Sequence, residues 1–329
     1  MKPKDLITTG VITLVLVAGV MAVILLTGDS DLFLWAADLF GKSPGSLAGQ
    51  VVWITGASSG IGEELAYVLA ASGCKLVLSA RRRNELERVG QHCMDEYKMR
   101  SEDVLILPLD LLQFDTHKSA VDIVLTHFKK IDILVNNAGR SQRALWVNTS
   151  FEVDREILEV NTLGPLSLTK AVLPHMVERK SGHIAVVSSV VGLMGAPGLG
   201  SYAGSKHALH GWFDTLRMEV FEDNIHISML CPGPIFSNAL KFAFTGKSGE
   251  ALGVDMEPGE RRMTTERCAH LCAVAIANQL DEAWISLQPE LSYYYLNQYM
   301  PAVARWAAVR IAGPRLQKLK EGRNDLHAS

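Results

Sequence analysis

The chain has 329 residues, 48% of them hydrophobic and 20% charged, and its formal net charge is -3. This composition is typical of a globular protein and excludes a disordered chain. A net charge near zero, without a long block of like charge, creates no field that would attract a polyanion, so nucleic-acid binding is not expected. The five cysteines form no C-x-x-C pair, which argues against a zinc site or a disulfide framework, and we predict no bound metal.

The N-terminal segment from Leu6 to Thr27 contains no charged residue and is long enough to span a bilayer. The apolar part of a cleaved signal peptide is only about 7–15 residues long, and no clear small-residue cleavage site follows here. We therefore predict an uncleaved membrane anchor over residues 1–28. Lys2 and Lys4 precede it, which favours a cytosolic N-terminus and a domain on the far side of the membrane. The sequon at Asn148 could be glycosylated only on that side.

After an expected linker over residues 29–49, apolar strands alternate with amphipathic helices. Strands are predicted at 51–55, 75–80, 104–108, 131–135, 183–188 and 226–231, and helices at 61–72, 84–97, 116–128, 151–179 and 201–221. This alternation is typical of an α/β fold with a doubly wound parallel sheet. We expect one Rossmann domain over residues 50–290, preceded by the anchor and followed by an aromatic and basic tail over residues 291–329. Cys268 and Cys272, four residues apart in a helical pattern, are interpreted as buried apolar residues.

A glycine-rich turn, T-G-A-S-S-G-I-G from Thr55 to Gly62, directly follows the first predicted strand. Glycines at 56, 60 and 62 permit a tight turn and the close approach of a pyrophosphate to a helix N-terminus. A purely structural turn is the alternative. The position between a strand and a helix favours the dinucleotide site.

The stretch Y-A-G-S-K places Tyr202 and Lys206 four residues apart. Residues at this spacing share one face of a helix, where an ammonium lowers the pKa of a phenol and makes it a usable proton donor. An unrelated surface pair is the alternative interpretation. The choice depends on what the rest of the chain supplies.

These two motifs occur in order with N-N-A-G (Asn136 to Gly139), Asn161, Ser188 with Ser189, and P-G-P (Pro232 to Pro234). In this set and order, the chain resembles the short-chain dehydrogenase/reductase family from about residue 50 to residue 237. The resemblance implies a nicotinamide cofactor and hydride transfer at a carbonyl carbon. The family usually has alanine two residues after the tyrosine, and Gly204 here would weaken the helix by about 0.5–1 kcal/mol.

Hydride transfer to a carbonyl leaves alkoxide character on its oxygen, which requires a proton donor and a second hydrogen-bond donor. Tyr202 is the predicted proton donor and Ser189 the second donor, and both are expected to contact the substrate. Lys206 is predicted to stabilise the phenolate and to bind the nicotinamide ribose. Asn161 resembles the family residue that orients the lysine and a water-linked proton path. His207 is interpreted as a helix-surface residue.

The second strand ends in L-S-A-R-R, without the carboxylate that would bind a ribose diol and repel a 2′-phosphate. Arg81 and Arg82 suit that phosphate, so NADP(H) is the predicted cofactor, with a solvated arginine pair as the alternative. From its place in the family pattern, Arg81 is expected to matter more than Arg82. The predicted cofactor-binding residues are Thr55, Gly56, Ser58, Ser59, Gly60, Ile61, Gly62, Arg81, Arg82, Asp110, Leu111, Asn137, Gly139, Tyr202, Lys206, Pro232, Gly233 and Ser237.

The predicted function is NADPH-dependent reduction of carbonyl groups on lipophilic substrates, with steroids, retinoids and other ketones, aldehydes and quinones implied by the resemblance. Two alternatives stay open: an NAD-dependent alcohol dehydrogenase working oxidatively, and a non-catalytic nucleotide-binding membrane scaffold. Intact Ser189, Tyr202 and Lys206 speak against the scaffold.

Three expectations concern the surroundings of this site. The region of about 236–263 resembles the family's substrate lid. The tail either lies at a membrane interface or packs on the domain. We expect a single-pass protein of the endoplasmic reticulum membrane with a lumenal domain, and the sequence leaves open the substrate and whether the chain forms a homodimer.

Overall fold

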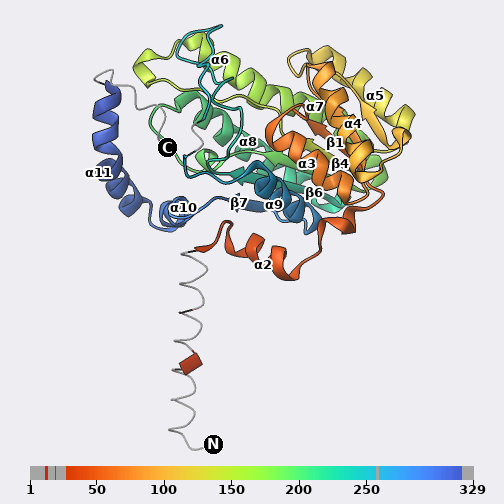
Figure 1. Cartoon of the computed structure of the whole chain (residues 1–329), viewed down its shortest axis with the longest axis horizontal. Helices are drawn as coiled ribbons and strands as arrows, with labels where there is room; N and C mark the ends of the chain where they lie inside the picture. Colours follow the sequence, from red (N-terminus) through yellow and green to blue (C-terminus); the bar gives the residue numbers. More distant parts are fainter. Residues whose placement is uncertain (1–11, 14–18, 20–26, 257–258, 321–329) are drawn as a thin grey trace, which may run out of the picture.

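The computed structural model describes residues 12–13, 19, 27–256 and 259–320, and contains one seven-stranded parallel sheet of order β3-β2-β1-β4-β5-β6-β7 (Figure 1). The strands are β1 (Val51–Thr55), β2 (Lys75–Ser79), β3 (Val104–Ile106), β4 (Ile133–Asn136), β5 (Gly182–Val187), β6 (Ile225–Pro232) and β7 (Glu282–Ile285). The predicted single parallel sheet is confirmed. The edge strand β7 was not predicted.

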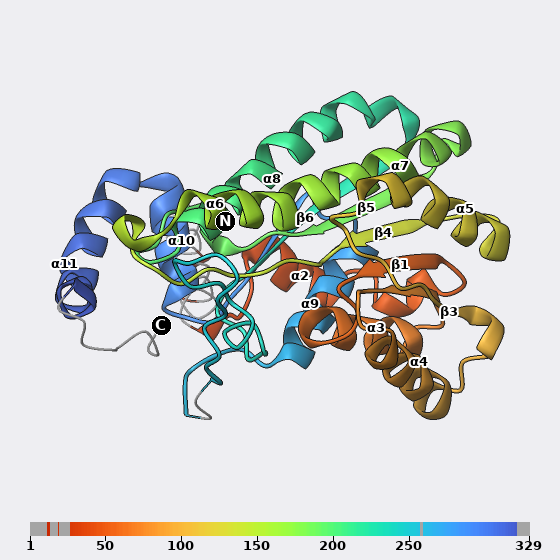
Figure 2. The same cartoon turned by 90° about the horizontal axis from the view of Figure 1, so that it is seen from above.

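Helices cover both faces of the sheet, as Figure 2 shows. One face carries α3 (Gly60–Ala71), α4 (Arg83–Tyr97) and α9 (Thr265–Ala277), and the other carries α5 (His117–Phe128), α7 (Gly164–Arg179) and α8 (Gly200–Glu219). Because both faces are covered, the central strands are buried, which explains their unbroken apolar runs. Cys268 and Cys272 are buried in α9, as predicted.

The direction in which strands are added to the sheet reverses between β1 and β4, which are neighbours in the sheet but not in the chain. In an open α/β sheet this reversal leaves a crevice beyond the carboxyl ends of the strands, where ligands bind. The motifs Thr55–Gly62, N-N-A-G and Ser188-Ser189 all follow strands that end at this edge. The fold therefore gathers the predicted site residues in one place.

The predicted helix over 151–179 is interrupted by a wider turn. It consists of α6 (Phe151–Leu158), a π-helical turn at Glu159–Leu163, and α7. A π turn contains one residue more than an α turn and often marks a functional site. Asn161 lies within it and is fully buried.

The expected linker over residues 29–49 contains a helix, α2 (Leu32–Phe40). The carboxylate of Asp31 caps this helix by accepting hydrogen bonds from the amides of Phe33 at 2.9 Å and Leu34 at 3.1 Å. The side chain of Leu34 is buried in the core. Within the described residues, no helix has the length and apolar character needed to cross a membrane. Most of the predicted anchor, Leu6 to Thr27, lies outside the described residues.

The tail begins with α10 (Glu290–Tyr299) and α11 (Pro301–Lys320), and residues 321–329 lie outside the described part. Leu291 and Tyr294 of α10 are buried in the domain, whereas Trp306 and Val309 of α11 are exposed. Between β6 and α9, where the lid was expected, the described residues form no helix or strand. Isolated bridges hold this lid segment, such as Phe244 with Gln142.

Candidate active site

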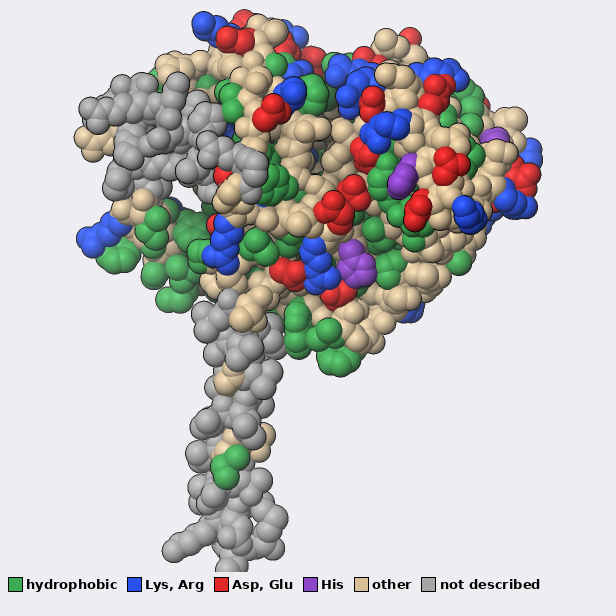
Figure 3. Space-filling view, viewed as in Figure 1, with side chains coloured by type: hydrophobic (Ala, Val, Ile, Leu, Met, Phe, Trp, Pro, Cys, Tyr) green, Lys and Arg blue, Asp and Glu red, His purple; other side chains and the backbone are tan. Residues whose placement is uncertain are grey.

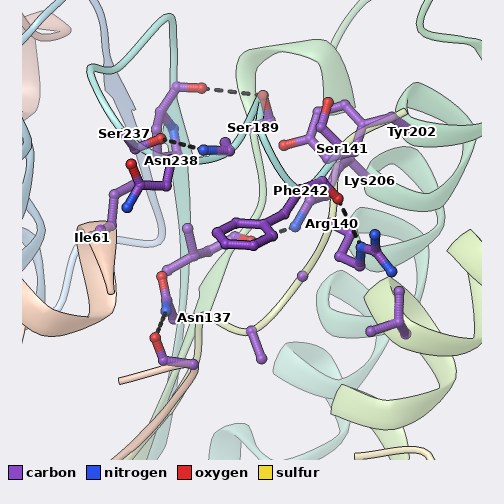
Figure 4. A pocket seen from close by; sticks show the side chains of 18 of the residues that line it. Ile61, Asn137, Arg140, Ser141, Ser189, Tyr202, Lys206, Ser237, Asn238 and Phe242 are labelled. Carbon is purple, nitrogen blue, oxygen red and sulfur yellow. Dashed lines mark hydrogen bonds between the residues drawn. The ribbon is translucent and has the colours of Figure 1, made fainter. Parts of the chain in front are cut away.

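A cavity of about 990 Å³ lies along the carboxyl edge of the sheet. The predicted residues that line it are Thr55, Gly56, Ser58, Ser59, Gly60, Ile61, Arg81, Arg82, Asp110, Leu111, Asn137, Gly139, Ser189, Tyr202, Lys206, Pro232, Gly233 and Ser237. Gly62 and Asn161 stand behind its wall and act on it through their neighbours. Figure 4 shows Ile61 on one side of the cavity and Tyr202 with Lys206 on the other.

The glycine turn has the shape of a cradle for a phosphate group. Gly56 and Gly60 have φ angles of +68° and +61°, which L side chains rarely adopt. A Cβ on Gly56 would lie 2.9 Å from the Cα of Ala138, and one on Gly62 would collide with the main-chain oxygen of Gly56. The side chain of Ser59 makes no capping hydrogen bond at the start of α3. The amides at that helix end are therefore available to an anion.

Hydrogen bonds join this turn to the chain after β4. The hydroxyl of Thr55 accepts from the amides of Asn137 at 3.0 Å and Ala138 at 3.2 Å. The Asn137 side chain donates to the main-chain oxygen of Thr55 at 2.9 Å. Thr55 and Asn137 therefore act by hydrogen bonding to the main chain of the facing segment. Their hydrogen bonds fix the distance between the ends of β1 and β4.

Arg81 and Arg82 stand at the mouth of the cavity, and both are exposed. Arg82 Nη2 donates to the hydroxyls of Ser58 at 3.1 Å and Ser59 at 3.3 Å, so this arginine lies against the glycine turn. Arg140, after β4, adds a third cation at the cavity wall. The pKa of Arg140 is lowered, first by burial and second by the charge of Arg81. The exposed guanidinium groups of Arg81 and Arg82 at the mouth are suited to a phosphate group, whereas Figure 4 shows Arg140 beside Lys206.

Three of the four predicted catalytic residues, Tyr202, Ser189 and Lys206, line the other end of the cavity, and the fourth, Asn161, lies behind its wall. Ser189 and Lys206 are buried, and Lys206 Nζ lies 5.7 Å from the ring centroid of Tyr202. Burial raises the pKa of the Tyr202 phenol above its ordinary value, against a hydrogen bond with Ser189 and the charge of Arg143, which both lower it. Burial lowers the pKa of Lys206 to about 8.

The pKa direction at Tyr202 is opposite to the one expected from Lys206 alone. The reason is that burial of the phenol itself disfavours the phenolate. Lys206 Nζ donates to the main-chain oxygen of Val187 at 2.8 Å. Arg143, which the sequence analysis did not consider, is the cation that lowers the pKa of the phenol.

Asn161 positions the loop after β4. Its Oδ1 accepts from the amide of Arg140 at 2.7 Å, and its Nδ2 donates to the main-chain oxygen of Arg140 at 2.9 Å and to the Ser205 hydroxyl at 3.0 Å. A Cβ on Gly139 would come within 3.0 Å of Asn161 Oδ1 and 3.6 Å of Lys206 Nζ. The asparagine therefore reaches the lysine through Gly139 and not by direct contact.

The lid segment closes over the cavity from the side of β6. Phe242 accepts a hydrogen bond at its main-chain oxygen from Arg140 Nε at 2.9 Å, and its ring lies 5.8 Å from the Arg82 guanidinium. Figure 4 shows this ring in the middle of the cavity. Ser237 lies beside the glycine turn, since a Cβ on Gly60 would stand 3.7 Å from its Cβ. Met194, Leu199 and Tyr294, which pack in the same apolar cluster as Tyr202, also line the cavity.

A second side-chain cluster lies behind Ser188 and was missed. His210 Nε2 is 3.0 Å from the Ser188 hydroxyl, and Nδ1 is 3.5 Å from the carboxylate of Glu282. Cys231 Sγ lies 3.8 Å from His210 Nε2. The side chains of His210, Cys231 and Glu282 are close enough to one another to share a metal ion. Burial raises the pKa of Cys231 well above its ordinary value, so the thiol stays protonated and is a poor ligand. His210 follows Lys206 by four residues on α8, so the two share one helix face, and this spacing could have predicted that His210 lies near the site.

A family model described as short chain dehydrogenase matches residues 50–247. The chain is 46% identical over 299 residues to the human protein named dehydrogenase/reductase SDR family member 7, which covers 90% of this chain and 88% of that protein. It is 38% identical over 271 residues to a Drosophila melanogaster dehydrogenase/reductase SDR family protein 7-like, covering 82% and 83%.

Two solved structures share the fold. An alcohol dehydrogenase from Thermococcus sibiricus, complexed with 5-hydroxy-NADP, is 26% identical with a TM-score of 0.63 and matches 73% of this chain and 97% of its own. A short-chain dehydrogenase from Streptomyces avermitilis, 24% identical with a TM-score of 0.66 over 81% of this chain and 97% of its own, shows the fold alone. The chain therefore belongs to the short-chain dehydrogenase/reductase family, and it is an oxidoreductase with a dinucleotide-binding Rossmann domain.

Proposed function

We propose that this oxidoreductase is an NADPH-dependent reductase of carbonyl groups on lipophilic substrates. The observation that carries the proposal is the single cavity that has Tyr202, Ser189 and Lys206 at one end and the glycine turn with two arginines at the other. The first group of residues supplies proton chemistry, and the second suits a phosphorylated dinucleotide. One ligand that extends along the cavity would contact both groups.

The preference for NADP(H) is supported by the residues at the end of β2. Ser79 and Ala80 precede Arg81 and Arg82, so no carboxylate stands where it would repel a 2′-phosphate. A guanidinium binds phosphate through paired N–H groups, which favours the phosphorylated cofactor. The related Thermococcus sibiricus enzyme was solved with an NADP derivative, which agrees with this preference.

The mechanism assigns one task to each polar side chain. When bound, the reduced nicotinamide supplies the hydride that converts the carbonyl carbon to a carbinol carbon. Tyr202 transfers its phenolic proton to the carbonyl oxygen, and Ser189 donates a second hydrogen bond to the same oxygen. Lys206 stabilises the phenolate that remains. A proton from solvent then returns the phenolate to the phenol, which closes the proton balance of the cycle.

The preference for lipophilic substrates is supported by the cavity wall next to Tyr202. Val191, Met194 and Leu199 line the cavity and pack in the same apolar cluster as Tyr202. Their burial by an apolar substrate would contribute about 25 cal/mol for each Å² removed from water. Steroids, retinoids, and other ketones, aldehydes and quinones of similar polarity are the substrate classes we propose.

We also propose that the chain is a single-pass protein of the endoplasmic reticulum membrane with its catalytic domain in the lumen. The uncharged segment Leu6–Thr27 and the preceding Lys2 and Lys4 support this arrangement. Asn148 is exposed, so its sequon is accessible to a glycosyltransferase. A mobility shift on glycosidase treatment that is absent from Asn148→Gln would support the lumenal placement. Digestion of the catalytic domain by protease added outside sealed microsomes would contradict it.

The reductive proposal is tested by initial rates with NADPH and NADH on a panel of lipophilic ketones, aldehydes and quinones. We expect faster reduction with NADPH on at least one class. Preference for NADH together with faster oxidation of the matching alcohols would favour the NAD-dependent alcohol dehydrogenase. Cofactor binding without turnover on any class, in either direction, would favour the nucleotide-binding scaffold.

A further inference from the structure

Helix α2 carries an apolar surface on the outside of the domain. Phe33 and Phe40 are seven residues apart on one helix face and are 80% and 81% exposed, and the neighbouring Leu39 is 55% exposed. We call these three residues the α2 apolar face. Exposed apolar side chains that gather in this way mark contact sites for a protein or a membrane.

The opposite side of α2 is already packed against the domain. Leu34 is fully buried. Asp38, the only charged residue of the helix, accepts hydrogen bonds from Arg267 at 2.8 Å and His270 at 2.9 Å on α9. A surface helix is normally polar where it faces water. Here the positions that face outward are apolar, which indicates a second apolar neighbour.

The chain that leads into α2 is fixed to the edge of the sheet. Ser30 forms an antiparallel bridge with Ile285 of β7, and the amide of Asp31 donates to the main-chain oxygen of Trp284 at 2.9 Å. The carboxylate of Asp31 accepts from the amide of Trp284 at 2.7 Å. Both Ser30 and Asp31 are buried. The start of α2 therefore has one position relative to the sheet.

The apolar sequence that we propose as the anchor ends three residues before Ser30, at Thr27. Three residues of extended chain span at most about 10 Å. If Leu6 to Thr27 lies in a bilayer, Ser30 cannot be farther than this from the membrane surface. Leu32, where α2 begins, lies two residues further along and so within about 17 Å of it. Lys42, just after the helix, is exposed, and a lysine next to a bilayer can extend its ammonium to lipid phosphate.

The side of the molecule that carries α2 is apolar beyond this helix as well. Figure 3 shows apolar side chains at the lower end of the molecule, where α2 lies in Figure 1, and at the lower left beside α10 and the start of α11. Helix α6 lies at the opposite end from α2 in Figure 1. Tyr299, Met300 and Trp306, at the end of α10 and on α11, are further exposed apolar side chains. The amide of Leu32 donates to the Tyr295 hydroxyl at 2.9 Å and so joins α2 to α10.

We infer that the α2 apolar face is a lipid-binding surface that seats the catalytic domain on the bilayer. The inference rests on the proposed membrane anchor and adds a second, interfacial contact to it. Phe33 and Phe40 then lie at the boundary of headgroups and acyl chains, about 5–10 Å deep. Since Glu290 and Tyr294 of α10 line the cavity, the seat holds one wall of the cavity beside the membrane from which a lipophilic substrate comes.

The test uses the full chain in phosphatidylcholine vesicles. Phe33→Cys, Phe40→Cys and Phe151→Cys are labelled with an environment-sensitive fluorophore, which is selective because all five native cysteines are buried. Phe151 is the matched control, a phenylalanine that is 71% exposed at the start of α6. Quenching is measured with iodide in the water and with nitroxides attached to the lipid at several depths. NADPH binding by each variant reports that the domain is folded.

We expect labels at positions 33 and 40 to be quenched several-fold less by iodide than the label at 151, and to be quenched most strongly by shallow lipid nitroxides. Equal iodide quenching at all three positions would show that the α2 apolar face does not bind lipid. Protection from iodide without lipid quenching, increasing with the protein-to-lipid ratio, would also contradict lipid binding and would indicate a second copy of the chain.

A separate measurement distinguishes failure of the seat from failure of the anchor. The native chain and the double variant Phe33→Asp with Phe40→Asp are floated with vesicles and washed at alkaline pH. If the anchor exists, both remain with the lipid, and the quenching result alone decides on the seat. If the native chain leaves the lipid in this wash, the anchor and the seat that rests on it are both overturned.

Discussion

The ammonium of Lys206 donates a hydrogen bond to the main-chain oxygen of Val187, at 2.8 Å, from a position inside the domain that is 4% exposed. Val187 is the last residue of β5, one residue before Ser188. The bond therefore ties α8 to the strand end that carries Ser189. It also places a desolvated cation where its charge is costly.

Lys206→Met should change how stability depends on pH. Burial lowers the pKa of Lys206 from 10.5 to about 8, so between these values the unfolded chain binds more protons than the folded chain. The contribution of Lys206 to the free energy of unfolding is therefore least favourable below pH 8. It increases by about 3 kcal/mol as the pH rises through the window from 8 to 10.5. We expect the stability of the Met variant, relative to the native chain, to fall by this amount over the window in denaturant titrations.

The exposed Lys170 on α7 supplies a control, because Lys170→Met removes an ammonium that is solvated in the folded chain. Its stability relative to the native chain should not follow the same window. A stability difference for Lys206→Met that is independent of pH would show that the buried amine is not a titrating cation.

Tyr202→Phe should remove most turnover and leave cofactor binding nearly intact. General acid catalysis contributes about 10²–10⁴-fold, and the phenol is the group beside Ser189 that has a proton to give. Tyr294→Phe is the matched control, because it removes another phenol from the lining of the same cavity. Its turnover should stay close to that of the native chain. Near-native turnover in Tyr202→Phe, measured by NADPH oxidation, would exclude the proposed proton donor.

Two glycine-to-alanine changes should differ in their effect, because one glycine is tightly packed and the other faces open space. In Gly62→Ala the new Cβ would collide with the main-chain oxygen of Gly56, so the cradle must shift and NADPH binding should be lost. In Gly204→Ala the new Cβ meets nothing within 4 Å, and α8 should gain about 0.5–1 kcal/mol of stability. Thermal unfolding and cofactor titration measure both. A Gly62→Ala chain that binds NADPH normally would refute the close packing of the turn.

The strands β1 to β6 could be predicted because parallel strands covered on both faces are short unbroken apolar runs, such as Val51–Thr55. Strand β7 could not, because it has four residues, begins with Glu282, and is stabilised mainly by pairing with β6. Helix α2 was taken for part of a linker because L-F-L-W-A-A-D-L-F is apolar on nearly every side and shows no polar face. Its exposed residues Phe33, Leu39 and Phe40 form the surface that we propose to bind lipid.

Within the site, local spacing was sufficient for Tyr202 and Lys206, because one helical turn determines that relationship. It was not sufficient for Arg140, which contacts Phe242 across 102 residues of sequence. Asn161 lies in the π turn and bonds to Arg140 and Ser205 from there. The residue pattern did not predict this turn, so these partners could not be predicted either. Long-range contacts of this kind follow from the packing of α8 and the lid and not from local sequence.

Arg81→Ala should weaken NADPH binding by about ten- to a hundredfold, since a charge-assisted hydrogen bond contributes about 1.5–3 kcal/mol. NADH, which lacks the 2′-phosphate, should bind almost unchanged. Arg82→Ala should cost less, because Arg82 Nη2 already donates to the hydroxyls of Ser58 and Ser59. Fluorescence titration with both cofactors measures this.

The neighbouring Arg83 provides the control for the arginine series. Its side chain pairs with Glu87 at 2.9 Å on the surface of α4, so Arg83→Ala should leave both affinities unchanged. Equal losses of NADH and NADPH affinity in Arg81→Ala would mean that the arginine is structural and does not select the cofactor.

The most direct measurement follows the hydride itself. NADPH that carries deuterium at the transferred position of its nicotinamide ring is incubated with the chain and a lipophilic ketone, and the alcohol is analysed by mass spectrometry. The account predicts one deuterium on the carbinol carbon, formed at a rate that falls by about 10²–10⁴-fold in Tyr202→Phe. An alcohol without deuterium, or deuterium transfer from labelled NADH in preference to NADPH, would contradict it.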